Sequence, residues 1–363
     1  MSMKKGLLDE EESPSHELTA IHLDEVSEDT RLSPNKHASE ADRTFFHGLP
    51  SQVVRTSRGD IHVMIQGDTS KKRTAIVTLH DIGQNHISGF QSIFSFHQFR
   101  PLLDNFTVYH LNFPGQQENA QELPQDYAYP TMDEMTGMVE EVLKYFNLTN
   151  TICFGIGAGA NVFVRLGLMD PRHVECCILV NATCTSSSWS EWGYEKMSSH
   201  YLKTKGMTQF CEDFLLSHYF GKVDETTNTD LLSIVRDNLR AIKYPRNLAM
   251  FMESYSKRPN IKITRPVIGD KTINTMKCGT LIITGANSPA VDDTVNLNSK
   301  LDPAKTTWMK ITDATSLVLD EQPTNVTNAI VLFLQGYGHA MKTRPPTLSF
   351  TRQEEIQGPP AIC

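Results

Sequence analysis

The 363-residue chain is short of cysteine, lacks long apolar runs and carries no excess of positive charge. Its seven cysteines include no C-x-x-C pair, which argues against a disulfide framework, a redox motif or a zinc site. No run approaches the ~18 apolar residues of a membrane span, and Met1–Glu10 lacks the apolar core of a signal peptide. These absences predict a cytoplasmic protein with reduced, mostly buried thiols.

The formal net charge of -8 is concentrated at the start of the chain. Residues 1–48 hold 11 Asp or Glu and five Lys or Arg, so the remainder is nearly balanced. A nucleic-acid-binding body would need a basic face, and the charge pattern therefore excludes nucleic acid as a partner. Residues 1–48 are polar and poor in aromatics, which predicts a disordered acidic tail. Residues 338–363 carry four prolines in a polar context and predict a second disordered tail.

Between the tails, short apolar runs alternate with segments of helical spacing. This alternation predicts an α/β fold with a mostly parallel sheet and helices on both faces. The alternation stops over residues 186–258, where aromatics and helix formers predict about four inserted helices. We therefore expect a core in two parts, 49–185 and 259–337, with a helical cap at 186–258. Expected strands are 51–56, 61–66, 74–80, 106–112, 151–154, 174–181, 280–284 and 306–311, and expected helices are 132–146, 159–169, 291–301 and 325–334.

A serine is missing from the segment Gly155-Ile156-Gly157-Ala158-Gly159. The segment follows an expected strand and precedes an expected helix, which is the context of the G-x-S-x-G nucleophile turn of α/β-hydrolases. Gly157 stands where the nucleophilic serine would be. The setting for a nucleophile is present without the nucleophile.

The other catalytic positions of an α/β-hydrolase are also replaced. A triad follows the order Ser, Asp or Glu, His along the chain, and the histidine needs the carboxylate to hold its tautomer. Ser288 stands at the acid position after the strand 280–284, and Ser316 at the histidine position. In the oxyanion segment Asp81 follows His80, which puts a carboxylate where an oxyanion requires unopposed donors. The sequence therefore predicts that the catalytic role is vacant at Gly157, Ser288 and Ser316.

A remnant of the pocket is still expected around the turn, and its sequence suggests two alternative ligands, an anion or a dinucleotide. The expected lining residues are His80, Asp81, Gly83, Gly155, Ile156, Gly157 and Ala158. The first helical turn after Gly157 offers a positive dipole end to an anion. The same segment also satisfies the dinucleotide fingerprint G-x-G-x-x-[GA], but Glu175 lies at the start of the next strand, whereas a ribose-binding acid belongs near its end. We therefore expect no cofactor and no metal.

Several long motifs resemble the N-myc downstream-regulated family, over roughly residues 50–337. They are the segments 79–86, 90–94, 112–118, 155–161 and 288–292. The resemblance implies an α/β-hydrolase fold without hydrolytic activity. It also implies a cytoplasmic protein with roles in differentiation, stress response, signalling and vesicle traffic, and hence peripheral contact with vesicle membranes. Family members carry a phosphorylated C-terminal tail, which makes Thr347, Ser349 and Thr351 candidate phosphorylation sites here.

Three functions remain open from the sequence. The first is a non-enzymatic adaptor that binds other proteins through the cap and the tails, where phosphorylation could reshape a segment. The second is a binder of a small ligand or lipid in the remnant pocket. The third is a hydrolase with a rewired site, in which His80 or Asp81 would carry the chemistry.

Overall fold

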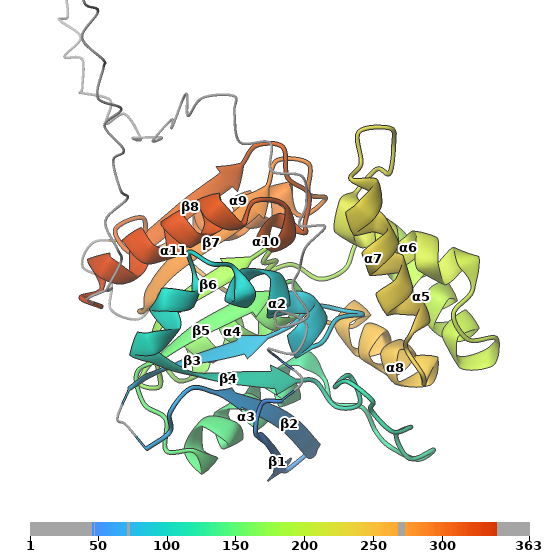
Figure 1. The fold of residues 1–363 in the computed structure, drawn as a ribbon, viewed down its shortest axis with the longest axis horizontal. Coiled ribbons are helices and arrows are strands. Elements are labelled where there is room, and N and C mark those ends of the chain that lie inside the picture. The colour runs from blue at the N-terminus through green and yellow to red at the C-terminus, as the bar shows by residue number, and fades with distance from the viewer. Residues whose placement is uncertain (1–45, 47, 71–72, 268–272, 340–363) are drawn as a thin grey trace, which may run out of the picture. The chain divides into compact units, whose positions relative to one another are not determined.

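A computed structural model describes residues 46, 48–70, 73–267 and 273–339 (Figure 1). Among these residues, no helix is both long and apolar enough to cross a membrane. Thr347, Ser349, Thr351 and nearly all of the two predicted tails lie outside the described residues. The predicted phosphorylation sites and tail disorder therefore stay predictions.

The centre of the structure is one eight-stranded sheet with the order β1-β2-β4-β3-β5-β6-β7-β8. β2 runs antiparallel to its neighbours β1 and β4, and every other pair is parallel. Most of the central strands are continuous apolar runs because both faces of a parallel sheet are covered. The strands are β1 (Ser51–Thr56), β2 (Gly59–Gln66), β3 (Thr74–Leu79), β4 (Phe106–Asn112), β5 (Thr151–Ile156), β6 (Val174–Val180), β7 (Gly279–Gly285) and β8 (Thr306–Ile311).

Helices cover both faces of the sheet and divide the core into two layers. One layer packs under α2 (His86–Ser95), α10 (Val318–Glu321) and α11 (Pro323–Gly336). The other packs under α3 (Met132–Tyr145), α4 (Ala158–Met169) and α9 (Val291–Lys300). A 3-10 helix, η1 (Arg100–Asn105), leads into β4. The predicted fold class is confirmed: a mostly parallel sheet lies between two layers of helices.

Four helices are inserted between β6 and β7, and they form the cap on one side of the sheet (Figure 1). The first two of these helices begin at residues whose side chains cap them. Ser188 and Glu191 form a capping box at the first helix, and Thr208 caps the second. The helices are α5 (Trp189–Thr204), α6 (Gln209–Phe220), α7 (Thr229–Arg240) and α8 (Pro245–Ser256).

The chain is ordered slightly beyond both predicted core boundaries. Phe46, which lies in the predicted N-terminal tail, is fully buried, and its ring lies 5.1 Å from that of His110. His339, which lies in the predicted C-terminal tail, bonds to Glu175 with an Nε2–Oε1 distance of 3.1 Å. Both residues fall outside the predicted core because a few contacts with distant residues leave no periodic signal in a polar stretch. The helix α2 was also not predicted.

The first turn of α4 depends on a close approach between helix and sheet. A Cβ on Gly159 would lie 2.1 Å from the backbone oxygen of Leu79 at the end of β3. This oxygen belongs to the sheet and cannot rotate away, so the position accepts only glycine.

We therefore expect Gly159→Ala to lower the free energy of unfolding by about 3 kcal/mol, through overpacking. Gly137→Ala in α3 is the matched control, because a Cβ there meets nothing within 4 Å. The control should be neutral or stabilising by up to about 1 kcal/mol. Urea unfolding of both variants measures the difference, and equal midpoints would contradict the close approach.

Candidate functional site

The turn between β5 and α4 has the sharp geometry of a nucleophile turn. Gly157 has φ 50° and ψ -109°, a region that residues with a side chain rarely enter. Its N–H donates to the Val180 oxygen at 2.9 Å, which ties the turn to the neighbouring strand β6. The backbone therefore presents position 157 above the carboxyl ends of the central strands.

The space over Gly157 is filled by the carboxylate of Asp81. A Cβ on Gly157 would lie 2.1 Å from the Oδ1 atom of Asp81. That Oδ1 accepts the N–H of Ile82 at 2.8 Å and the N–H of Ala158 at 2.9 Å. In α/β-hydrolases the oxyanion hole is built from the N–H after the nucleophile and an N–H of the loop after β3. Asp81 thus occupies both donors and the volume of a serine side chain.

The second carboxylate oxygen of Asp81 binds the cap. His218 of α6 lies with its Nε2 2.8 Å from Oδ2 of Asp81. Burial alone would raise the pKa of Asp81, but the positive charge and hydrogen bond of His218, with the two backbone N–H groups, hold that pKa below its usual value. Burial likewise opposes the charged form of His218, yet the Asp81 carboxylate raises the pKa of His218. Each partner therefore favours the charged form of the other.

His80 points away from this pair and is held in one tautomer. Its Nδ1 donates to the Asp81 carbonyl oxygen at 2.7 Å, and its Nε2 accepts the N–H of Phe113 at 3.1 Å. Burial lowers the pKa of His80 to about 4. Both ring nitrogens are engaged, so in this arrangement neither is available as a general base.

Ser288 and Ser316 bond to each other, and Ser316 also holds the cap. Their hydroxyl oxygens lie 2.7 Å apart, and the Ser288 hydroxyl donates to the Asn181 side chain at 3.2 Å. The N–H of Ser316 donates to the oxygen of Tyr219 at 2.9 Å. The Tyr219 hydroxyl in turn donates to the oxygen of Ile82. The last turn of α6 is therefore hydrogen-bonded to the two loops that carry the oxyanion and histidine positions.

The amino-acid sequence matches the Ndr family over residues 51–341. Protein NDRG3 of Xenopus tropicalis is 37% identical over 308 residues, which covers 82% of this chain and 78% of the relative. Protein NDRG1 of Xenopus tropicalis is 36% identical over 299 residues, with 82% and 72% covered. The chain belongs to the Ndr family.

Solved structures similar to this Ndr-family chain share its fold at low sequence identity. An esterase from Thermogutta terrifontis superposes with a TM-score of 0.63 at 16% identity and covers 79% of this chain and 98% of its own. The enol-lactonase from Burkholderia xenovorans LB400 has a TM-score of 0.61 at 17% identity, with 78% and 100% covered. The Ndr-family chain therefore has an α/β-hydrolase fold.

The predicted remnant pocket is brought together only in part. Asp81, Gly157 and Ala158 meet at the turn, whereas Gly155 and Ile156 are buried within β5. Gly83 lines a cavity of ≈ 40 Å³ between α7 and the loop after β3, with Tyr219 and Leu239. That volume suits a water molecule or two and is far below the ~300 Å³ of a small-molecule pocket.

Sequence reasoning missed the residues that the cap contributes to the site. His218 and Tyr219 were read as part of a helical insertion and received no role. One signal was available: a buried carboxylate needs a partner, and the predicted cap contains only two histidines, His200 and His218. Pairing Asp81 with a cap histidine could have been proposed on those grounds.

A double-mutant cycle on Asp81→Asn and His218→Gln tests this coupling between core and cap. Each change should lower the free energy of unfolding by about 1.5–3 kcal/mol, the range for hydrogen bonds to charged groups. The double variant should lose clearly less than the sum, because both changes break the same contact. Urea unfolding gives the three values, and strict additivity would show that the two side chains act independently.

The stability of the chain should also depend on pH through two cap residues. Glu195 of α5 is buried, and burial together with neighbouring Glu191 raises its pKa from 4.5 to about 8. Its contribution to stability is complete below pH 4.5 and is lost progressively as the pH rises from 4.5 to about 8. The pKa of His218 is raised above 6.5, so its contribution is complete below pH 6.5 and is lost as the pH rises through the folded-state value.

The free energy of unfolding should therefore fall as the pH rises from about 4.5 to about 8 through Glu195, and above pH 6.5 through His218 as well. His218→Gln and Glu195→Gln should each flatten that fall, and Glu225→Gln in an exposed cap loop should leave it unchanged. Chemical unfolding at a series of pH values measures the slope. A slope that is identical in all four proteins would refute the assignment.

Proposed function

We propose that this Ndr-family chain is a non-enzymatic protein that uses the α/β-hydrolase fold as a scaffold for binding other proteins. The observation that supports the proposal most directly is the position of the Asp81 carboxylate. It accepts both backbone N–H groups that an oxyanion would need, at 2.8 and 2.9 Å. An oxyanion approaching these donors would meet a fixed negative charge.

Two further observations point the same way. The Ser288 and Ser316 hydroxyls pair with each other, and neither can act as a general base or hold an imidazolium. Gly157 supplies no nucleophilic atom. We include in this proposal that the catalytic positions 157, 288 and 316 are vacant. The contact between the Ser288 and Ser316 hydroxyls supports this.

The contacts that catalysis would need are used to hold the cap. His218 and Tyr219 bind the loop after β3, and Ser316 binds the backbone of α6. A cap held in this way offers a fixed outer surface, and preorganised surfaces lose less freedom when they bind. We propose that partner proteins bind the cap and the tails. The proposed setting is the cytoplasm, in signalling, differentiation, stress response or vesicle traffic. Peripheral contact with vesicle membranes is part of the same proposal.

An esterase assay tests the absence of catalysis. Purified wild-type chain should hydrolyse p-nitrophenyl acetate no faster than buffer. Gly157→Ser should not restore turnover, because the Asp81 carboxylate occupies the two oxyanion-hole donors and Ser316 stands where the triad histidine would be. This variant should also lower the free energy of unfolding by about 1–3 kcal/mol, since serine must adopt φ 50° and displace Asp81.

The alternative of a rewired hydrolase makes the opposite prediction. It requires turnover by the wild-type chain that disappears in His80→Ala or Asp81→Ala while both variants remain folded by circular dichroism. That result would overturn the proposed function.

A further inference from the structure

A cavity of ≈ 40 Å³ lies where α7 of the cap meets the core, and the contacts described so far leave it without a role. The apolar part of its lining includes Leu231, Val235 and Leu239 of α7, with Leu317 just before α10. The polar part includes Gln84 and Ser88 near the start of α2, and Asp320 of α10. We call this space the α7 cavity. It combines an apolar wall with the carboxyl group of Asp320.

Asp320 has no cationic partner within the described part of the chain. The described residues that line the α7 cavity include no lysine, arginine or histidine. The side chains that act on the charge of Asp320 are those of Ser92 and Glu321, neither of which is a cation. Burial raises the pKa of Asp320 from 3.8 to about 7. An ionised carboxylate without a cation is costly away from water, so the ionised form calls for a cation that these residues do not supply.

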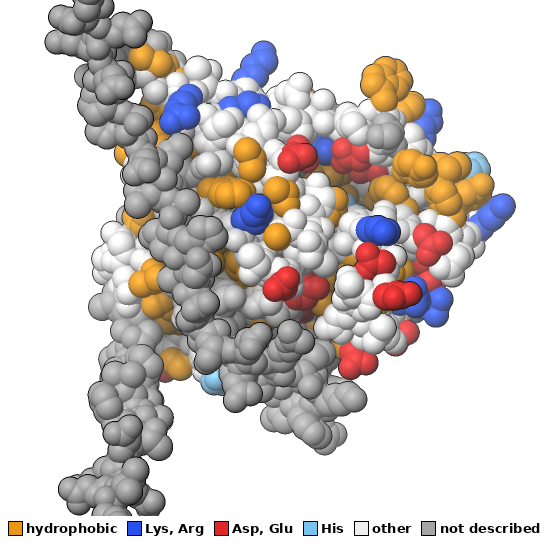
Figure 2. Space-filling model, turned by 90° about the horizontal axis from the view of Figure 1, so that it is seen from above, with side chains coloured by type: hydrophobic (Ala, Val, Ile, Leu, Met, Phe, Trp, Pro, Cys, Tyr) orange, Lys and Arg blue, Asp and Glu red, His pale blue; other side chains and the backbone are white. Residues whose placement is uncertain are grey.

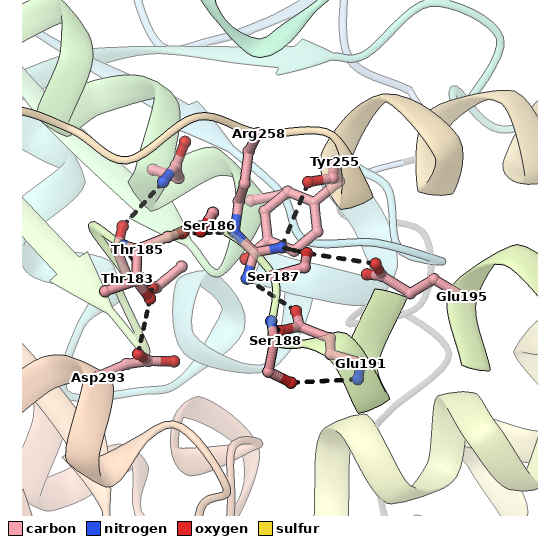
Figure 3. Close-up of polar contacts among 12 residues, drawn as sticks. Thr183, Thr185, Ser186, Ser187, Ser188, Glu191, Glu195, Tyr255, Arg258 and Asp293 are labelled. Carbon is pink, nitrogen blue, oxygen red and sulfur yellow. Dashed lines mark hydrogen bonds and ion pairs between the residues drawn. The ribbon is translucent and has the colours of Figure 1, made fainter. Parts of the chain in front are cut away.

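Elsewhere in the cap, carboxylates are paired with cations of the same chain. Figure 3 shows the buried guanidinium of Arg258 beside Glu191, to which it donates at 2.8 Å. Arg240 donates to both oxygens of the buried Glu212, at 2.7 and 2.9 Å. Asp320 differs from these carboxylates in two ways: it has no such partner among the described residues, and it lines a cavity. Its cation can therefore be supplied by another molecule.

The size and lining of the α7 cavity select among cations. A volume of ≈ 40 Å³ admits about two atoms of water size, which fits an ammonium group and the methylene that carries it. A guanidinium is planar and carries three nitrogens, so it is too wide. The apolar residues of α7 can contact the methylene stem of a lysine, whereas a hydrated metal ion gains nothing from them. Gln84 adds a buried Oε1 that no described group bonds, and an ammonium has three hydrogens to donate.

The rim of the α7 cavity is apolar and acidic. Ile234 lines the cavity and is 57% exposed. Asp230 and Asp237 are exposed and stand four residues before and three residues after Ile234, so the three share one side of α7. The two arginines of α7 instead meet Glu212 of α6, at 3.8 and 2.7 Å. Figure 2 shows acidic and basic side chains intermingled over the cap end of the molecule, so the negative rim is a local feature that complements a basic partner.

We propose that the α7 cavity binds the side chain of one lysine from a basic and apolar segment of a partner protein. The ammonium bonds to Asp320, and the methylene stem lies against the apolar residues of α7. Ile234 and the two aspartates of the rim contact the residues on either side of that lysine. Protein interfaces concentrate their affinity in a few such anchored side chains. The proposal rests on the proposed protein-binding function and names the chemistry of one binding surface.

NMR of the full chain, labelled at its isoleucine, leucine and valine methyl groups, tests the cavity directly. The probe is n-butylammonium, which reproduces the four carbons and the ammonium of a lysine side chain, at a pH above the Asp320 pKa of about 7. It should shift the methyl signals of Leu231, Ile234 and Val235 saturably and leave that of the exposed Leu332 on α11 unchanged. Potassium chloride at the same concentration should leave all four signals unchanged. Equal shifts with potassium would overturn the proposal, and so would the absence of saturable shifts.

Asp320→Asn should weaken the binding of n-butylammonium roughly tenfold, because it removes a charge-assisted hydrogen bond. Its thermal stability should not fall, since burial already disfavours the ionised carboxylate that asparagine replaces. Asp126→Asn is the matched control: it makes the same change at an exposed carboxylate in the loop after β4 and should bind as the wild-type chain does. Equal affinity in the Asp320→Asn and Asp126→Asn variants would refute the role of Asp320.

Two short peptides extend the test from the side chain to a protein segment. The acetylated and amidated peptide Gly-Leu-Lys-Leu-Gly should shift the same methyl signals and compete with n-butylammonium. The same peptide with arginine in place of lysine should bind roughly tenfold more weakly, because its guanidinium does not enter the cavity. Equal binding of the two peptides would show general attraction to a negative surface and would overturn the lysine site. Esterase turnover by the wild-type chain would remove the proposed function and leave these shifts unaffected, so the two failures are distinguishable.

Discussion

The carboxylate of Asp81 is the group on which the site depends. It satisfies the two N–H donors at the start of α4 and after β3, and it pairs with His218 of the cap. The helix dipole and the fixed N–H groups at this turn favour an anion. The chain supplies that anion itself. In other proteins with this fold the two N–H groups could stabilise a transition state. In this chain they bind the Asp81 carboxylate and stabilise the native state.

Once Asp81 takes this position, the neighbouring residues are constrained. Gly157 cannot gain a side chain, because a Cβ would collide with the carboxylate. His218 must remain in reach, because a buried unpaired carboxylate would be costly. Ser316 donates hydrogen bonds to the backbone of α6 through its N–H and its hydroxyl. Its side chain is small, so α6 can lie close to the sheet. Residues at separate points along the chain, 81, 157, 218 and 316, therefore support a single packing arrangement.

The fold was predictable from the sequence and the cap contacts were not. Apolar runs such as 74–79 and 280–284 mark buried parallel strands by composition alone, and the glycine-rich turn marks the β5–α4 junction. The role of His218 depends on how the cap lies over the sheet, which local patterns do not encode. Phe46 and His339 show the same limit near the ends of the described chain, since each is fixed by a few distant partners.

Holding the cap also changes what the outer surface can do. In a working hydrolase a cap admits substrate and releases product, and such steps require motion. Here the last turn of α6 is bonded to the loop after β3 and to the loop after β8. Arg258 joins the segments at which the cap enters and leaves the core. A surface held from both ends keeps its apolar residues in fixed positions, which lowers the entropy cost of association. The contacts made by Asp81, His218 and Ser316 thus hold the cap in the way that the proposed binding role of its outer surface requires.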